Sequence, residues 1–189
     1  MQPTDDGQGD GVDAFTLVVL AGLPGTGKST LAARLAAALD APLFSKDRVR
    51  EALFGPRHVR YERAQDDAVV ACLVAAAAHA AETGLARYAL LDGRTFSRAG
   101  QLEALRAELS ARGIVERTIE LVAAPDVARA RLAAQADHPA ADRGPALYDA
   151  LAAQAAPVPG PKLVLDGGAL APEELEALAL AWLREGAVP

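Results

Sequence analysis

Apolar residues along the chain alternate between short continuous runs and longer runs in which they recur every three to four positions. The short runs are typical of strands buried on both faces, and the longer runs are typical of helices with one apolar face. The pattern predicts strands at 15–21, 42–45, 88–92, 115–123 and 162–166, and helices at 28–39, 47–54, 61–83, 97–112, 125–135, 145–155 and 172–184. This alternation predicts an α/β fold, a three-layer sandwich of about five parallel strands with helices on both faces.

Segments with few apolar residues suggest how the domain is bounded. Residues 1–13 carry four aspartates, three glycines and no basic residue, so we expect a disordered acidic leader. Residues 136–145 and 156–161 are rich in proline, aspartate and glycine, a composition typical of mobile connections. We therefore expect a single domain over 14–189 with a small lid near 136–160.

The composition narrows the class of protein. A chain of 189 residues is long enough to bury one substantial core. Apolar residues make up 51% of the sequence, but they form no uninterrupted run long enough to span a bilayer. The leader resembles neither a secretory signal nor a transit peptide, so we expect a cytoplasmic protein that does not bind membranes. Cys72, the single cysteine, lies in an alanine-rich helical pattern and is interpreted as a small buried apolar residue rather than a reactive thiol.

A glycine-rich turn links the first predicted strand to the first predicted helix. It satisfies the phosphate-binding loop (P-loop) pattern and consists of Gly22, Leu23, Pro24, Gly25, Thr26, Gly27, Lys28, Ser29 and Thr30. Its glycines permit positive φ angles, which let backbone N–H groups point at the phosphates of a nucleotide, and the helix that follows directs the positive end of its dipole there. We expect Lys28 to reach the β- and γ-phosphates and the Ser29 hydroxyl to bind Mg²⁺.

Ligands of open parallel sheets bind beyond the carboxyl ends of the strands, so polar residues there are candidates for the active site. Asp47 follows the second strand; it is either the base that takes the proton of an attacking hydroxyl or an N-cap of the next helix. Arg50, one turn later, is a candidate for binding an acceptor group through two hydrogen bonds from its guanidinium. Asp92 ends the third strand and is either a carboxylate beside Mg²⁺ or a turn residue, and Arg94 next to it is a candidate substrate-binding residue.

Several arginines precede or lie within the predicted lid. Phosphoryl transfer needs cations over the migrating group, and a closing segment that carries arginine supplies them and excludes water. The candidates are Arg129, Arg131 and Arg143. Basic residues also outnumber acidic ones, six to three, between positions 46 and 63. A solvated helix face is the favoured interpretation of this excess, and a groove that attracts an anionic acceptor is the alternative.

Taken together, these motifs resemble the small P-loop kinases, which include polynucleotide 5′-kinases, chloramphenicol phosphotransferase and zeta-toxin-like sugar-nucleotide kinases. The resemblance covers about 15–168 and rests on the loop Gly-Leu-Pro-Gly-Thr-Gly-Lys-Ser-Thr, then Ser-Lys-Asp-Arg-Val-Arg, then Leu-Leu-Asp-Gly-Arg-Thr-Phe and an arginine-led lid. It implies a P-loop NTPase fold, Asp47 as the general base and Arg50 as a grip on an acceptor phosphate. It likewise implies that Lys28 binds the phosphates, that Ser29 and Asp92 lie at the metal, and that residues 166–168 lie near the adenine.

The lid departs from the pattern of that family. Such kinases commonly carry two lid arginines four residues apart, whereas here Arg131 is followed at that spacing by Gln135. The catalytic lid arginine is therefore expected to be Arg131, with Arg143 as the alternative.

The function that these features predict is an ATP- and Mg²⁺-dependent kinase. It would transfer the γ-phosphoryl group to a hydroxyl of a small acceptor such as an antibiotic, a nucleoside or a sugar. A polynucleotide 5′-hydroxyl is a second acceptor, less favoured because 4% aromatic residues leave few platforms for stacking bases. A nucleotide-dependent switch or binding module is the alternative from another class, although an Asn-Lys-x-Asp motif for reading guanine is absent.

Overall fold

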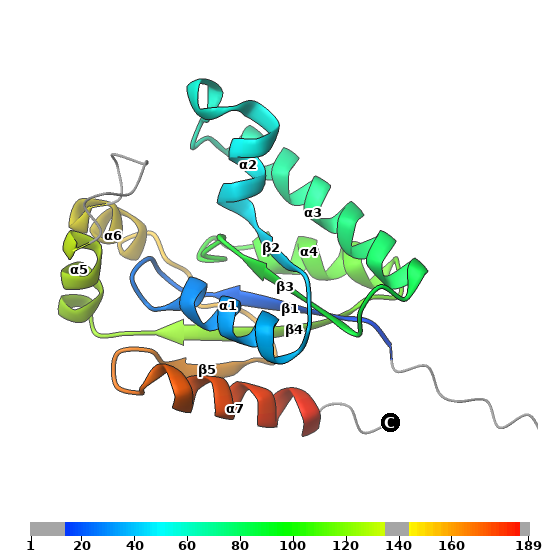
Figure 1. The fold of residues 1–189 in the computed structure, drawn as a ribbon. Coiled ribbons are helices and arrows are strands. Elements are labelled where there is room, and N and C mark those ends of the chain that lie inside the picture. The colour runs from blue at the N-terminus through cyan, green and yellow to red at the C-terminus, as the bar shows by residue number, and fades with distance from the viewer. Residues whose placement is uncertain (1–13, 135–143, 186–189) are drawn as a thin grey trace, which may run out of the picture.

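Five parallel strands form one sheet in the order β2-β3-β1-β4-β5, as the computed structural model shows (Figure 1). The structure describes residues 14–134 and 144–185. The strands are β1 (Thr16–Ala21), β2 (Leu43–Ser45), β3 (Tyr88–Asp92), β4 (Val115–Val122) and β5 (Leu163–Asp166). The first strand lies in the middle, so the loop that follows it opens at the centre of the carboxyl edge, between the ends of β3 and β4.

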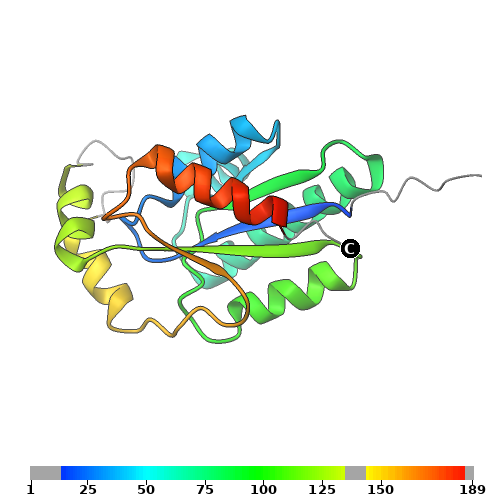
Figure 2. The same ribbon diagram turned by 90° about the horizontal axis from the view of Figure 1, so that it is seen from below.

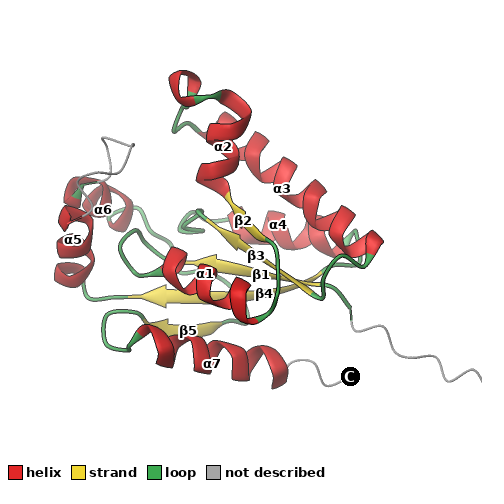
Figure 3. Ribbon diagram, in the orientation of Figure 1, coloured by secondary structure: helices red, strands yellow, loops and turns green. Residues whose placement is uncertain are grey.

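Helices cover both faces of the sheet, as Figures 2 and 3 show. The helices are α1 (Lys28–Ala38), α2 (Lys46–Phe54), α3 (Arg63–Thr83), α4 (Gln101–Ser110), α5 (Pro125–Ala134), α6 (Pro145–Ala152) and α7 (Pro172–Glu185). Buried side chains of α3 and α4 pack on one face of the sheet, and those of α1 and α7 pack on the other.

The central strand shows why the sequence forms three layers. All six residues of β1 are buried, and successive side chains point to opposite faces. Leu17 and Val19 belong to the core beneath α3 and α4, whereas Val18 and Leu20 belong to the core beneath α1 and α7. A continuous apolar strand is therefore required at this position, and the predicted three-layer α/β fold is confirmed.

The predicted boundaries differ from the observed ones mainly around α4. The sequence predicts a helix over 97–112, but α4 spans Gln101–Ser110 because Gly100 takes a left-handed conformation and ends the loop before it. Phe96 in that loop is buried and also has a positive φ of 53°. A short 3₁₀ helix at Pro56–His58 was not predicted. The loop after β3 is thus longer than expected, and it contributes to the site described below.

Helices α5 and α6 pack against each other beside the phosphate-binding loop (Figure 1). Ala128, Leu132 and Tyr148 form a small buried cluster between them, and Leu23 of the loop packs against it. The pair forms a helical projection at the carboxyl edge of the sheet, separate from the two main cores. Part of the predicted lid, 136–143, lies outside the described residues, as does the predicted leader, 1–13.

Two further expectations concern single features of the chain. Cys72 is exposed on α3, so its interpretation as a buried residue is wrong: the alanine-rich helix turns this position toward solvent. Among the helices that the structure describes, none combines the length and apolar character needed to cross a bilayer.

Candidate active site

The phosphate-binding loop connects β1 to α1, as predicted, and its shape depends on glycines. Gly22, Gly25 and Gly27 have φ angles of 123°, 78° and 101°, which side chains rarely allow. A Cβ built on Gly22 would overlap the carbonyl oxygen of Leu121, and one on Gly25 would lie 2.6 Å from the carbonyl oxygen of Ala128. The loop is therefore held closely between β4 and α5, and only glycine fits at these two points.

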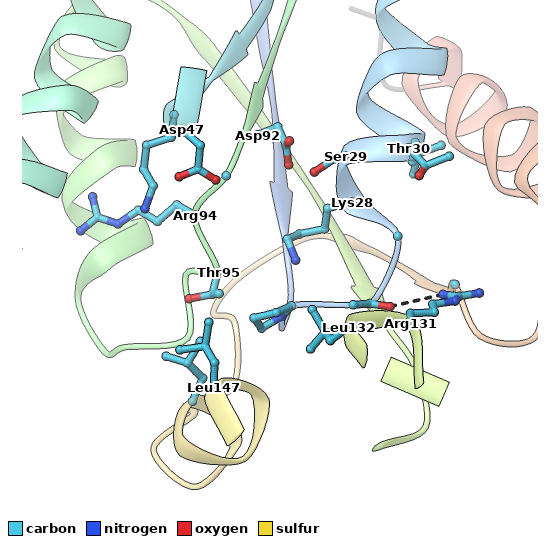
Figure 4. A pocket seen from close by; sticks show the side chains of 18 of the residues that line it. Lys28, Ser29, Thr30, Asp47, Asp92, Arg94, Thr95, Arg131, Leu132 and Leu147 are labelled. Carbon is cyan, nitrogen blue, oxygen red and sulfur yellow. Dashed lines mark hydrogen bonds between the residues drawn. The ribbon is translucent and has the colours of Figure 1, made fainter. Parts of the chain in front are cut away.

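Lys28 is the first residue of α1 and lines the mouth of the loop (Figure 4). Its ammonium group donates a hydrogen bond to the carbonyl oxygen of Leu23, at 2.6 Å, and the Thr26 hydroxyl donates to the same oxygen at 2.9 Å. These contacts fold the lysine back over the loop. A cation and the N-terminus of α1 consequently face the same space, an arrangement suited to a polyphosphate.

Asp92 and Ser29 both line this space, and their side-chain oxygen atoms point toward each other in the view of Figure 4. Asp92 is 5% exposed, and its Oδ1 atom has no hydrogen-bond partner among the described residues. A buried carboxylate oxygen without a donor is costly unless a cation neutralises it. A hydroxyl beside a carboxylate fits Mg²⁺, which keeps few protein ligands and takes the rest from water and phosphate. The described residues contain no cluster of three histidine, cysteine or acidic side chains that would bind a metal without such help.

Asp47 approaches the cavity from the opposite side, at the second position of α2 (Figure 4). Ser45 occupies the N-cap position of α2, without a side-chain capping hydrogen bond, and Asp47 lies inside the first turn, so the N-cap alternative does not describe Asp47. Its Oδ1 atom accepts a hydrogen bond from Arg50 Nη1 at 2.9 Å. The carboxylate is thereby oriented by an arginine one turn along the same helix.

Arg50 is the centre of a buried ionic cluster between α2 and α3. It is 1% exposed; besides Asp47 it donates to Asp66, and its guanidinium lies 5.1 Å from the ring centre of Tyr61. Lys46 Nζ donates to the second oxygen of Asp66 at 3.2 Å, and burial lowers the pKa of Lys46. Two cations thus share two carboxylates, and the cluster joins α2 to α3. Lys46 belongs to the Ser-Lys-Asp-Arg-Val-Arg motif but was not predicted to take part in the site, and Tyr61 and Asp66 lie in no motif that would have identified them.

Arg94 lines the same side of the cavity, in the loop after β3. Its Nη2 atom donates to Asp67 of α3 at 3.0 Å, while its Nε atom is buried without a hydrogen-bond partner among the described residues. The neighbouring carbonyl of Thr95 accepts a hydrogen bond from the backbone N–H of Gly22 at 3.0 Å. The loop that carries Arg94 is therefore anchored directly on the phosphate-binding loop.

The basic residues between 46 and 63 do not act as one group. Lys46 and Arg50 are buried in the ionic cluster, and Arg63 lines the cavity although its side chain is 83% exposed. Arg48, Arg57 and Arg60 are exposed. The stretch is therefore partly a solvated face, as favoured, and partly a wall of the cavity.

The lid arginines differ in where they point. Arg131 lines the cavity, and its Nη1 atom lies 3.4 Å from the carbonyl oxygen of Gly25 (Figure 4). Arg129 instead pairs with Asp149 of α6, at 2.6 Å, on the outside of the helical projection. Of these two, Arg131 alone reaches the phosphate-binding loop. Arg143 and Gln135 lie outside the described residues.

One cavity of about 750 Å³ connects the phosphate-binding loop with Asp47, Asp92, Arg94 and Arg131. Gly167, in the loop after β5, forms part of its wall and touches the phosphate-binding loop so closely that a Cβ there would overlap the Thr26 carbonyl oxygen. Leu147 and Leu151 of α6 also line the cavity. Sequence reasoning missed both leucines, although their spacing of four on a short helix was a signal of one apolar face.

Known proteins share this fold. A proposed kinase from Chloroflexus aurantiacus J-10-fl is 27% identical, with a TM-score of 0.70 over 91% of this chain and 98% of that chain. A gluconokinase from Sinorhizobium meliloti 1021 is 17% identical, with a TM-score of 0.66 over 93% of this chain and 94% of that chain. Kti12 from Chaetomium thermophilum, in complex with ADP-AlF3, is 17% identical, with a TM-score of 0.64 over 92% of this chain and 100% of that chain.

A family model described as an AAA domain matches residues 17–161, whereas no curated protein matches the chain. The resemblance to P-loop kinases is thus confirmed at the level of the fold, and kinship with polynucleotide kinases, chloramphenicol phosphotransferase or zeta toxins stays a prediction. Because the family model covers most of the chain, including the phosphate-binding loop, Asp47 and Asp92, this protein belongs to the AAA domain family of P-loop nucleotide-binding proteins.

Proposed function

We propose that the protein is a kinase that uses ATP and Mg²⁺ to phosphorylate a hydroxyl of a small molecule. The observation that carries the proposal is the single cavity of about 750 Å³, lined at one end by the phosphate-binding loop and at the other by Asp47. A volume of this size accommodates the phosphates of a nucleotide and a small acceptor together. A protein that only bound or hydrolysed nucleotide would have no need of the second half.

The phosphate half of the cavity holds the donor. Backbone N–H groups of the loop and the N-terminus of α1 bind the phosphates, and Lys28 and Arg131 bring positive charge to the oxygens of the migrating group. Ser29 and Asp92 would hold Mg²⁺, which neutralises charge on the β- and γ-phosphates when it is bound.

The acceptor half supplies the base. The hydroxyl oxygen of the acceptor forms a bond to the γ-phosphorus while Asp47 accepts the proton of that hydroxyl. The bond between that phosphorus and the bridging oxygen breaks, and ADP leaves with the negative charge. Arg50 holds the carboxylate of Asp47 in place, so that the base is oriented before the acceptor binds.

Relatives support a small acceptor. The proposed kinase and the gluconokinase share the fold over more than nine tenths of this chain. The alternative of a polynucleotide 5′-hydroxyl loses support, because the guanidinium of Arg50 is 1% exposed and is already bound to Asp47 and Asp66. An arginine in that position orients the base instead of gripping an acceptor phosphate.

Measurement of ATP turnover with and without a library of hydroxyl compounds tests the proposal. We expect strong stimulation by particular acceptors and a mass increase of one phosphoryl group in the product. Turnover that no acceptor stimulates, with tight nucleotide binding, would instead identify a nucleotide-dependent switch.

A further inference from the structure

The acceptor half of the cavity has two walls of opposite character. One wall comes from α2, α3 and the loop after β3, and it carries Asp47, Asp66 and Arg94. The other wall comes from α5 and α6, and it carries the aliphatic side chains of Leu132, Leu147 and Leu151. A molecule between these walls meets charge on one side and hydrocarbon on the other.

The position of the aliphatic wall is well determined by its packing. Tyr148 is 4% exposed and packs with Ala128 and Leu132 in the cluster between α5 and α6. This packing directs the neighbouring Leu147 away from the cluster and into the cavity, where its side chain points toward Thr95 in the view of Figure 4. Leu151, one turn further, continues the same face of α6.

Leu147 belongs to the acceptor half and not to the nucleotide half. In Figure 4 it lies on the same side of Lys28 as Asp47 and Arg94, while Arg131 and Thr30 lie on the other side. Gly167 lies near the Arg131 end of the loop, since a Cβ on either Gly167 or Gly27 would meet Leu121 and one on Gly27 would also lie 3.9 Å from Arg131 Nη1. The base of a nucleotide whose phosphates occupy the loop would extend in that direction. Leu147 and Leu151 therefore remain for the acceptor.

An aliphatic wall selects against molecules with hydroxyl groups on every face. Each hydroxyl pressed against leucine side chains loses its hydrogen bonds to water and gains none in return. An apolar ring face placed there is instead removed from water favourably. We infer that the acceptor is an amphipathic hydroxyl compound, with an aromatic or aliphatic face against Leu147 and Leu151 and its reacting hydroxyl toward Asp47. This inference rests on the proposed function and makes the two leucines determinants of acceptor specificity.

Matched pairs of probe compounds test this inference by binding alone. Phenyl glucoside is compared with glucose, and thymidine with 2-deoxyribose, on protein saturated with Mg²⁺ and a non-hydrolysable ATP analogue. We expect the member that carries the phenyl or thymine group to bind at least about tenfold more tightly in calorimetry, in at least one pair. Saturation-transfer NMR should place the strongest protein contact on its ring protons.

Leu147→Asn and Leu151→Asn identify the surface responsible. Either change should lower the affinity for the probe that carries the phenyl or thymine group about tenfold and leave the affinity for the ATP analogue and the melting temperature unchanged. Leu178→Asn is the matched control, since this leucine of α7 is 47% exposed and lies outside the cavity; it should change none of these values.

Equal or tighter binding of both unsubstituted sugars, unchanged binding in both leucine variants, or no binding of any probe overturns the inference. The proposed function is judged separately. It survives if any other hydroxyl compound in the library is phosphorylated, and it fails if the protein binds ATP but phosphorylates none.

Discussion

The two halves of the cavity are built in different ways. The phosphate half is made mostly of backbone, shaped by three glycines with positive φ angles in one continuous loop. The acceptor half is made of side chains from α2, α3, α6 and the loop after β3, which are distant in sequence. Phosphates are the same in every nucleotide and backbone N–H groups serve them well. Acceptors differ, and only side chains can match them.

The largest expected effect is on the phosphate half. Lys28→Met should lower kcat by at least about 10³-fold, because the lysine charge is needed most where negative charge develops in the transition state. The measurement is phosphoryl transfer to the identified acceptor, alongside circular dichroism to verify the fold. Arg48→Met, an exposed change on α2, is the control and should retain full activity. Near-normal turnover in Lys28→Met would refute the assignment of the phosphate half.

The next effect is on the acceptor half. Asp47→Asn keeps the size of the side chain and removes the base, so kcat should fall by about 10²-fold or more. The affinity for ATP should stay unchanged in calorimetry, because Asp47 faces the acceptor. Intact transfer in this variant would remove Asp47 from the mechanism.

The backbone of the phosphate half is tested by Gly22→Ala. We expect the free energy of unfolding to fall by about 2–3 kcal/mol, because a side chain would be strained at a φ of 123° and would push into the Leu121 carbonyl. Gly113→Ala is the control, with a φ of 69° but nothing within 4 Å of the added carbon. Denaturant unfolding of both variants should show a loss of only about 1 kcal/mol in the control. Equal losses would mean that the contact with β4 contributes nothing.

The smallest effect probes the ionic cluster of the acceptor half. Asp66 is 27% exposed, so Asp66→Asn should lower the stability by about 1–2 kcal/mol, less than a fully buried pair would lose. Because Arg50 then holds Asp47 less firmly, kcat should fall about fivefold with an unchanged KM for ATP. Glu108→Gln breaks an exposed pair with Arg112 and should change stability by less than about 0.5 kcal/mol. A kcat equal to that of the wild type would make the cluster purely structural.

The phosphate half could be predicted from the sequence because its signals are local. The loop, its strand and its helix are consecutive, and Asp92 follows directly from the end of an apolar strand. The alternating pattern also predicted all five strands within one residue of their ends. Such features depend on neighbouring residues along the chain, which a sequence displays directly.

The acceptor half could be predicted only in part, because its contacts join distant segments. Asp47 and Arg50 were found by their place after a strand, but the bond from Arg50 to Asp66 spans two helices and has no local signature. The same holds for Leu147, whose role depends on the packing of α5 against α6. The exposure of Cys72 was also mispredicted, since an alanine-rich helix has little amphipathic pattern to orient it.

Two of the three leucines of the aliphatic wall, Leu147 and Leu151, lie on one short helix. α6 comprises only Pro145–Ala152, and its described contacts include the buried cluster with α5, against which Leu23 of the phosphate-binding loop also packs, and the ion pair between Arg129 and Asp149. Neither the glycine loop nor the Asp47 cluster includes any residue of α6. If Leu147 and Leu151 select the acceptor as inferred above, exchange of this one short helix would redirect the proposed kinase to other acceptors and leave the phosphate-binding loop and Asp47 in place.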